Sequence, residues 1–213
     1  MYDIGFIDED EGQRSQFYHT FKDDFVVHLI KPKEGSTATE LVLKALAEKV
    51  QLLVIDFRMN EFLDFNGDSV VRALETINPE LPVIVLTSHK DDALDSVDDF
   101  RMVFDKSVWE DPEAAKLTAF KKNLKQLIGS YELKVNSAET RLKELNETLS
   151  AKGLEGKEED EYIALNTFLE QVLGQGARTG RQFYSKSTND RLDALMAGTQ
   201  ELLEKIKEVN ASI

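Results

Sequence analysis

Short apolar runs separated by amphipathic segments make up the first half of the chain. Five of these runs predict β-strands, at residues 3–7, 25–30, 52–55, 82–87 and 102–104. Several are apolar throughout, which is typical of parallel strands that are covered on both faces. Helical patterns alternate with them, near 12–21, 37–49, 67–78 and 91–97. The alternation predicts an α/β fold with a doubly wound, five-stranded parallel sheet over residues 1–112.

The period of the pattern changes after Asp111-Pro112, a pair that suits the start of a helix. Apolar side chains then follow one another at spacings of three or four residues: Leu117, Phe120, Leu124, Leu127, Tyr131, Val135, Ala138, Leu142, Leu145 and Leu149. This heptad-like seam predicts one long helix from 112 to 151. The two glycines within 151–160 predict a turn after it.

Further helical patterns follow the turn. An apolar set from Tyr162 to Leu173 and another near 189–210 predict two shorter helices, joined through the glycine-rich residues 174–182. We therefore expect residues 113–213 to be an all-α extension. One arrangement is a helical hairpin or three-helix bundle, in which the later helices fold back along the long one. The other is a coiled coil between two copies, since no later segment matches the length of the 117–149 seam.

Charge separates the same two halves. Residues 1–112 hold 11 Lys and Arg against 24 Asp and Glu, a balance of −13, whereas residues 113–213 hold 15 against 16. An acidic surface repels the phosphates of nucleic acids, and neither half has a basic patch with aromatic side chains. We expect no nucleic acid partner.

Composition also bears on the compartment. The chain has no cysteine, no apolar run of about eighteen residues and an acidic start that does not match a signal peptide. These features predict a soluble cytoplasmic protein without a membrane segment.

Acidic side chains stand where two predicted strands end. Asp56 follows the apolar run 52–55, and Asp8 and Glu9 follow the first strand. Because the carboxyl ends of parallel strands meet at one edge of a sheet, we expect these acids to converge. Clustered carboxylates repel one another unless a cation joins them, and their hard oxygen atoms suit Mg²⁺.

Two further groups are expected at the same edge. Thr87 ends the fourth strand, and Lys106 follows the fifth. Together with the acids, they form a set that can transfer a phosphoryl group, in which Asp56 attacks phosphorus and the lysine neutralises its oxygens.

The motifs that carry these residues are "IGFIDED", "LLVIDFRM", "IVLTS" and "VFDKS". In them, residues 1–112 resemble the receiver domain of two-component response regulators. The resemblance implies that Asp56 accepts a phosphoryl group from a histidine kinase or phosphotransfer protein. It implies that Asp8, Glu9 and Asp56 hold Mg²⁺ together with the backbone carbonyl of Arg58.

The same resemblance implies that Thr87 and Lys106 bind the phosphoryl oxygens. The resemblance also places Arg58 and His89 at the two positions that, in this family, tune how fast the phosphoryl group is lost. The aromatic switch residue of the family would fall at Val103, and strand alternation points the neighbouring Phe104 to the other face of the sheet.

We therefore expect a phosphoryl-accepting response regulator that signals through a helical protein-interaction module. The chain has no recognisable DNA-binding motif, and no enzyme activity is expected beyond its own phosphorylation and dephosphorylation. A receiver without an effector, acting as a phosphate sink or relay, is one alternative. A degenerate receiver used as a scaffold is another. The sequence specifies neither the kinase nor the partner of the helical half.

Overall fold

The computed structural model describes residues 1–59, 62–88, 103–110 and 114–173 of the chain. The chain divides into two compact units, Met1–Lys134 and Val135–Ile213. The first unit includes the start of the long helix, which the sequence-based division at 112/113 assigned to the helical half.

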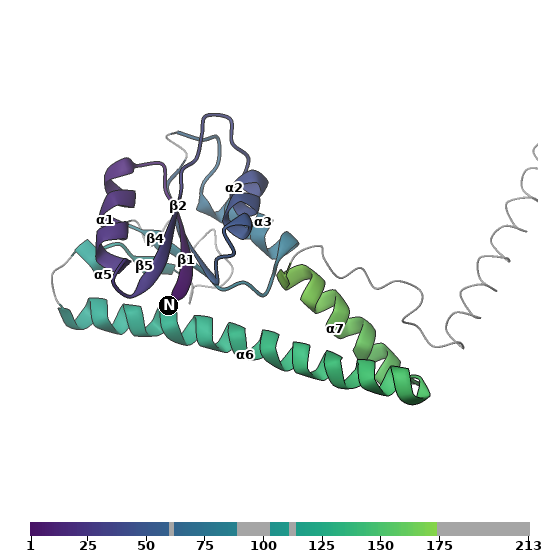
Figure 1. Cartoon of the computed structure of the whole chain (residues 1–213). Helices are drawn as coiled ribbons and strands as arrows, with labels where there is room; N and C mark the ends of the chain where they lie inside the picture. The colour runs from purple at the N-terminus through teal and green to yellow at the C-terminus, as the bar shows by residue number, and fades with distance from the viewer. Residues whose placement is uncertain (60–61, 89–102, 111–113, 174–213) are drawn as a thin grey trace, which may run out of the picture. The chain divides into compact units, whose positions relative to one another are not determined.

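The first unit holds a five-stranded parallel sheet in the order β2-β1-β3-β4-β5 (Figure 1). The strands are β1 (Tyr2–Ile7), β2 (Phe25–Ile30), β3 (Leu52–Asp56), β4 (Val83–Thr87) and β5 (Val103–Asp105). The predicted doubly wound fold is therefore confirmed, with β3 at the centre of the sheet. In this flavodoxin-like order the chain reverses its direction of winding at β1 and β3, and ligands bind beyond the carboxyl ends of these strands.

Helices connect and follow the strands. They are α1 (Glu11–Phe21), α2 (Ala38–Ala47), α3 (Gly67–Ile77), the short α5 (Ser107–Glu110), α6 (Ala114–Lys152) and α7 (Lys157–Leu173). A capping box begins α2, because Thr37 and Glu40 exchange side chain–backbone hydrogen bonds. The helices predicted near 91–97 and 189–210, the joint at 174–182 and the Asp111-Pro112 start lie outside the described residues.

Alternation along the strands divides the buried side chains between two cores. Ile55, Val85 and Val103 face α2 and α3 on one side of the sheet. Val54 and Leu86 face α1 and the start of α6 on the other side. Figure 1 shows α1 and the pair α2 and α3 on opposite sides of the sheet. Helices on both faces explain why these strands have almost no polar positions.

The two side chains at the start of β5 follow the same rule. Val103 is buried in the core beside α2 and α3, and Phe104 packs in the opposite core, with its ring 5.3 Å from that of Phe120 in α6. The expectation that Phe104 points away from the face of Val103 is confirmed.

The first five turns of α6 belong to the core of the sheet. Phe120, Leu124 and Ile128 are buried against the strands, and Ile128 is fully inaccessible. The seam read from the sequence contained Leu127 instead, whose side chain is 37% exposed. A four-residue step from Leu124 rotates by about 40° around a helix of 3.6 residues per turn, and a three-residue step by about 60° the other way. Ile128 therefore lies nearer the centre of the buried stripe.

Polar contacts tie α6 to the first unit at several places. Lys121 and Lys125 both pair with Asp24, at 2.9 and 2.7 Å, and lie over the rings of Phe21 and Phe25. Further along, Gln51 Nε2 donates to Glu132 Oε1 at 2.6 Å, and Lys134 pairs with Glu80 at 2.6 Å. These contacts explain why the compact unit ends near Lys134 rather than at the start of the helix.

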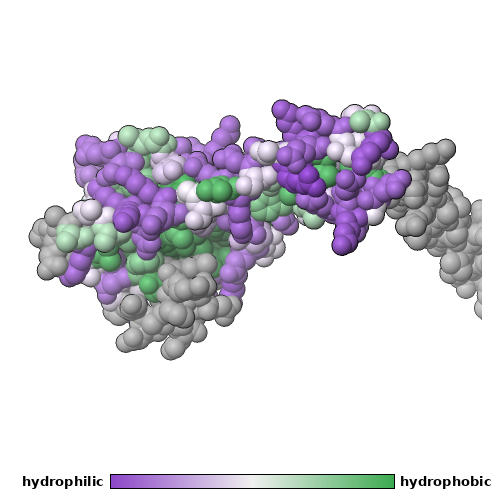
Figure 2. Space-filling model, turned by 90° about the horizontal axis from the view of Figure 1, so that it is seen from below, coloured by the Kyte–Doolittle hydropathy of each residue, from purple (hydrophilic) through white to green (hydrophobic). Residues whose placement is uncertain are grey.

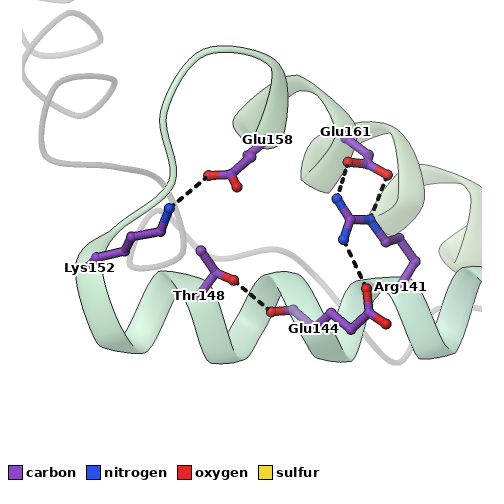
Figure 3. A network of polar contacts seen from close by, with 6 residues as sticks. All are labelled: Arg141, Glu144, Thr148, Lys152, Glu158 and Glu161. Atoms are coloured by element: carbon purple, nitrogen blue, oxygen red, sulfur yellow. Dashed lines mark hydrogen bonds and ion pairs between the residues drawn. The ribbon is translucent and has the colours of Figure 1, made fainter.

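The described part of the second unit is a hairpin of α6 and α7. Gly153 and Gly156 both have positive φ angles, of 82° and 56°, which suit the tight connection predicted here. Its core is small and centres on a cluster of Leu145, Leu154 and Tyr162. A surface network supports the pair, in which the guanidinium of Arg141 donates to both carboxylate oxygens of Glu161 at 2.8 Å (Figure 3). On the face seen in Figure 2 the hairpin is mostly hydrophilic.

The apolar residues of the long seam therefore pack against other parts of the same chain. Its early members pack against the sheet, and Leu142, Leu145 and Leu149 pack in the hairpin with Tyr162 and Leu165 of α7. A coiled coil of two copies along the whole seam would have to displace both sets of contacts.

Across the stretches that the structure describes, none of the helices is long and apolar enough to cross a bilayer.

Candidate functional site

Three carboxylates from two strands converge at the carboxyl edge of the sheet. Asp56 is the last residue of β3, and Asp8 and Glu9 directly follow β1, its neighbour in the sheet. One oxygen from each lies within 4.8 Å of the others. Among the described residues this is the one group of three such side chains close enough to share a metal ion. The convergence expected from strand order is present in the fold.

A lysine from a third strand completes the cluster. Lys106 follows β5, and its Nζ lies 2.9 Å from Asp56 Oδ1 and 3.5 Å from Asp8 Oδ2. All three side chains are nearly excluded from solvent. One ammonium thus faces two carboxylates in a region of low dielectric, where charges interact strongly.

Burial shapes the electrostatics of the cluster. It raises the pKa of Asp8 to about 6, and the nearby charge of Asp56 adds to the increase. Burial likewise raises the pKa of Asp56 to about 6, although Lys106 opposes the change. Burial alone would lower the pKa of Lys106, but the two carboxylates outweigh it, so that its pKa is raised. The lysine is therefore charged, and it does not fully compensate the acids.

The remaining predicted residues lie as follows. Thr87, the buried last residue of β4, accepts a backbone hydrogen bond from Lys106 N–H at 3.0 Å through its carbonyl oxygen. Arg58 has an exposed side chain, and a hydrogen bond from its backbone N–H to the Asp56 carboxylate slightly opposes the increase that burial causes in the pKa of Asp56. His89 lies outside the described residues.

Sequence reasoning overlooked Arg14. Its side chain is 5% exposed, and Nη1 donates to the backbone oxygen of Asp8 at 2.6 Å. Asp8 Oδ1 also accepts from the backbone N–H of Asp10 at 2.8 Å. These bonds fix the turn after β1 that presents Asp8. The signal available was an arginine one turn into a helix whose other inward positions are Phe17 and Phe21.

Asp10 itself is not part of the cluster. It caps α1, because its side chain accepts from the backbone N–H of Gln13 at 2.7 Å. Asp10 is therefore an exposed helix-capping residue and not a further member of the carboxylate cluster.

The start of α3 holds the backbone of Asp56 in place. Gly67 N–H donates to Phe57 O at 2.8 Å, so that the loop after β3 returns to the end of the strand. A Cβ on Gly67 would lie 2.6 Å from the backbone oxygen of Asp56 and 3.0 Å from Phe57 Cα. Only glycine allows this close approach.

We accordingly expect Gly67→Ala to destabilise the first unit by about 1–3 kcal/mol, the usual cost of overpacking against backbone. Urea unfolding would measure it. Gly129→Ala is the matched control, since among the described residues no atom outside the neighbouring backbone of α6 lies within 4 Å of a Cβ at this position. That change should stabilise the helix by roughly 0.5–1 kcal/mol. Equal effects of the two substitutions would contradict the packing argument.

A divalent cation fits the acidic cluster. Glu9 Oε2 is buried and has no hydrogen-bond partner within the described part of the chain. The donor atoms are carboxylate oxygens, which Mg²⁺ and Ca²⁺ prefer, and no cysteine is present in the chain. The raised pKa values of Asp8 and Asp56 are those of carboxylates that lack full compensation. Asp8, Glu9 and Asp56 would hold the ion.

Sequence comparisons add nothing to this geometry: no protein-family model matches the chain, and no curated protein matches it. Comparison of structures does give matches. The chain is similar to NtrX from Brucella abortus, at 15% identity and a TM-score of 0.47, over 70% of this chain. It spans only 34% of the length of NtrX.

Two more solved structures resemble the chain. An adenylate cyclase from Rhodopirellula baltica matches at 21% identity and a TM-score of 0.45, over 66% of this chain and 96% of that one. The signal receiver domain of an HD domain-containing protein from Pseudomonas fluorescens Pf-5 matches at 14% identity and a TM-score of 0.47. The match covers 62% of this chain and 90% of that one.

The strand order and the helices on both faces decide the fold of the first unit. It is the receiver fold. The carboxylates and the lysine lie at the edge of the sheet where this fold places its ligands.

Proposed function

We propose that the chain is a phosphoryl-accepting response regulator, in which Asp56 takes a phosphoryl group from a phosphohistidine of a kinase or phosphotransfer protein. One observation carries the proposal. The carboxylate of Asp56 lies at the end of the central strand, within 4.8 Å of two acids and 2.9 Å from the ammonium of Lys106. Acids, a hydroxyl and a lysine gathered from four strand ends suit phosphoryl transfer.

In the proposed reaction, a carboxylate oxygen of Asp56 attacks phosphorus and forms an O–P bond. The P–N bond of the donor breaks, and its electron pair returns to the imidazole of the histidine. Water later attacks phosphorus, which releases inorganic phosphate and restores the carboxylate. Lys106 balances the charge of the phosphoryl oxygens in both steps, because its ammonium already lies beside Asp56.

The other groups have supporting roles. A cation held by Asp8, Glu9 and Asp56, with the carbonyl of Arg58, would neutralise negative charge on the transferred group. Thr87 would donate its hydroxyl to a phosphoryl oxygen after transfer. The exposed side chain of Arg58, two residues past Asp56, would tune the rate of hydrolysis, and His89 is assigned the same role.

Output through the helical half is part of the proposal. The segment that carries Lys106 is in contact with α6 through the edge-to-face pair of Phe104 and Phe120. If Lys106 shifts toward a phosphoryl group, β5 moves with it, and the contact between Phe104 and Phe120 would pass this movement on to the first turns of α6. Val103, an aliphatic side chain, occupies the buried position on the other face, so that no aromatic ring of β5 can rotate there.

Phosphorylation by a small molecule tests the proposal without a kinase. Incubation of the full chain with acetyl phosphate and Mg²⁺ should add one phosphoryl group, detected by intact-protein mass spectrometry and by retardation on a Phos-tag gel. Borohydride should then reduce the acyl phosphate at Asp56 and at no other aspartate, which identifies the phosphorylated residue. Absence of the adduct, with beryllofluoride also failing to bind, would favour the use of this fold as a scaffold.

A further inference from the structure

A small pocket lies at the carboxyl edge of the sheet, between the loops that follow β2 and β3. Its volume is about 380 Å³, and it is lined by residues 35–38 of the first loop and 62–65 of the second. Both loops leave the sheet at the edge that carries Asp56, since all strands are parallel. A pocket of this size holds one or two side chains rather than a nucleotide cofactor.

The second loop is built on the backbone of Asp56. It begins right after Asp56 and closes where Gly67 N–H meets Phe57 O. Phe62 is six residues past Asp56, which places it within roughly 20 Å even for an extended chain. A typical protein interface covers about 800 Å² on each partner, a patch roughly 30 Å across. A patch of this size is wide enough to include both Asp56 and the pocket, so that a protein that delivers a phosphoryl group to Asp56 can also reach the pocket.

The wall of the pocket is fixed in place although it faces solvent. The backbone N–H groups of Phe62 and Leu63 both donate to Met59 O, at 3.1 and 2.7 Å. Leu63 and Met59 are buried, yet the side chain of Phe62 is 46% exposed. Exposure of a large aromatic ring to water is unfavourable. Contact with an apolar group of a partner would remove part of this ring from water and lower the free energy.

The polar side chains of the opposite wall already take part in hydrogen bonds within the chain. Ser36 Oγ accepts from the backbone N–H of Lys33 at 3.0 Å, and Thr37 forms the capping box with Glu40. Gly35 and Ala38 add no polar side chain. The pocket consequently offers an apolar surface, with the exposed carboxylate of Asp64 at its lining.

The negative charge of this part of the chain indicates which residues a partner would carry around the apolar side chain that enters the pocket. Residues 1–112 carry a balance of −13, and the acids of the candidate site share the same edge. A partner surface with basic residues around its apolar anchor complements this field and associates faster than a neutral one.

We propose that this pocket receives an apolar side chain of the phosphoryl-donating protein, which presents basic residues around it. The inference rests on the proposed function and adds the place at which the donor is recognised. Phe62 supplies the main contact, as aromatic side chains do at the centres of interfaces.

Photocrosslinking in the cells that express the chain tests the contact. A benzoylphenylalanine replaces Phe62 in one full-length variant and Leu43 in the control; Leu43 is 51% exposed on α2 and does not line the pocket. The expected result is an adduct, through position 62 and not 43, with a protein that carries a phosphohistidine, either a kinase or a phosphotransfer protein. No such adduct at position 62 would overturn the inference.

Transfer kinetics give the second readout. The captured protein, purified and phosphorylated on its histidine, should phosphorylate Phe62→Ala at least roughly tenfold more slowly than wild type, the effect of losing an interface anchor. Leu43→Ala should behave as wild type. Acetyl phosphate makes no protein contact, so it should label Asp56 equally in all three chains. Equal transfer to Phe62→Ala would overturn the docking site alone, and failure of acetyl phosphate on the wild type would overturn the proposed function.

Discussion

Asp56→Asn is expected to abolish phosphorylation of the chain by acetyl phosphate and Mg²⁺. An amide is not a nucleophile toward phosphorus under these conditions, and no other acid of the cluster is paired so closely with Lys106 as Asp56, at 2.9 Å. The expected loss is at least about a thousandfold in the labelling rate, as for other single changes of a nucleophile. Phos-tag electrophoresis and intact mass would measure it.

The matched control for this change is Asp10→Asn. Asp10 lies two residues past Asp8, is exposed and caps α1 instead of joining the cluster. Its replacement should leave labelling within about twofold of wild type, because asparagine caps helices as well as aspartate does. Retained labelling of Asp56→Asn at the wild-type rate would place the acceptor elsewhere.

The cation-free chain is expected to lose stability as the pH rises from about 4 to above 6. The pKa of Asp8 and of Asp56 is about 6 in the folded chain and about 3.8 in the unfolded one, so that the folded state binds more protons in this window. Unfolding then releases protons, which makes it more favourable at higher pH. For one such carboxyl taken alone, a difference of about two pH units corresponds to roughly 3 kcal/mol.

Mg²⁺ should reverse this loss above pH 6. Binding to the folded state alone stabilises it by about 2.7 kcal/mol at a hundred times the dissociation constant. For a chain of this length, that corresponds to a rise of roughly 5–10 °C in the unfolding midpoint of the first unit. Because protons compete for the same oxygens, the rise should be larger at pH 7.5 than at pH 5. Scanning calorimetry with and without Mg²⁺ at both pH values would measure it.

Asp8→Asn provides the control for this experiment. It removes one of the two carboxyls with raised pKa and one oxygen donor of the cluster. The variant should be less sensitive to pH in the absence of cations and should respond less to Mg²⁺. A response to Mg²⁺ equal to that of the wild type would mean that the ion binds at another place on this acidic chain.

Much of the site could be read from the sequence, because strand order translates directly into position. Asp8, Glu9 and Asp56 follow apolar runs that only buried parallel strands explain, and adjacent parallel strands end at the same edge. Arg14 was missed since a charged residue at an inward position of a helix has no distinctive pattern. Its partner is a backbone oxygen, which any residue offers.

The long helix α6 was predicted from the spacing of its apolar residues, but the elements that cover its apolar side were not. Spacings of three and four residues predicted α6, but the same spacings suit a coiled coil, a sheet face and a helical hairpin. The structure uses the sheet face for Phe120, Leu124 and Ile128 and the hairpin for Leu145. Periodicity indicates which side of a helix is apolar and contains no information on what covers that side.

By itself, the sequence determined the α/β fold with its five-stranded parallel sheet and the identity of the acids at the strand ends. These follow from the order of elements along the chain and from local chemistry. Only the tertiary structure decided that Lys106 pairs with both Asp56 and Asp8, that Gly67 packs on the backbone of Asp56 and that Phe62 stays exposed beside a pocket. Such contacts join residues that are distant in sequence, and their distances depend on how whole elements pack, which no local pattern encodes.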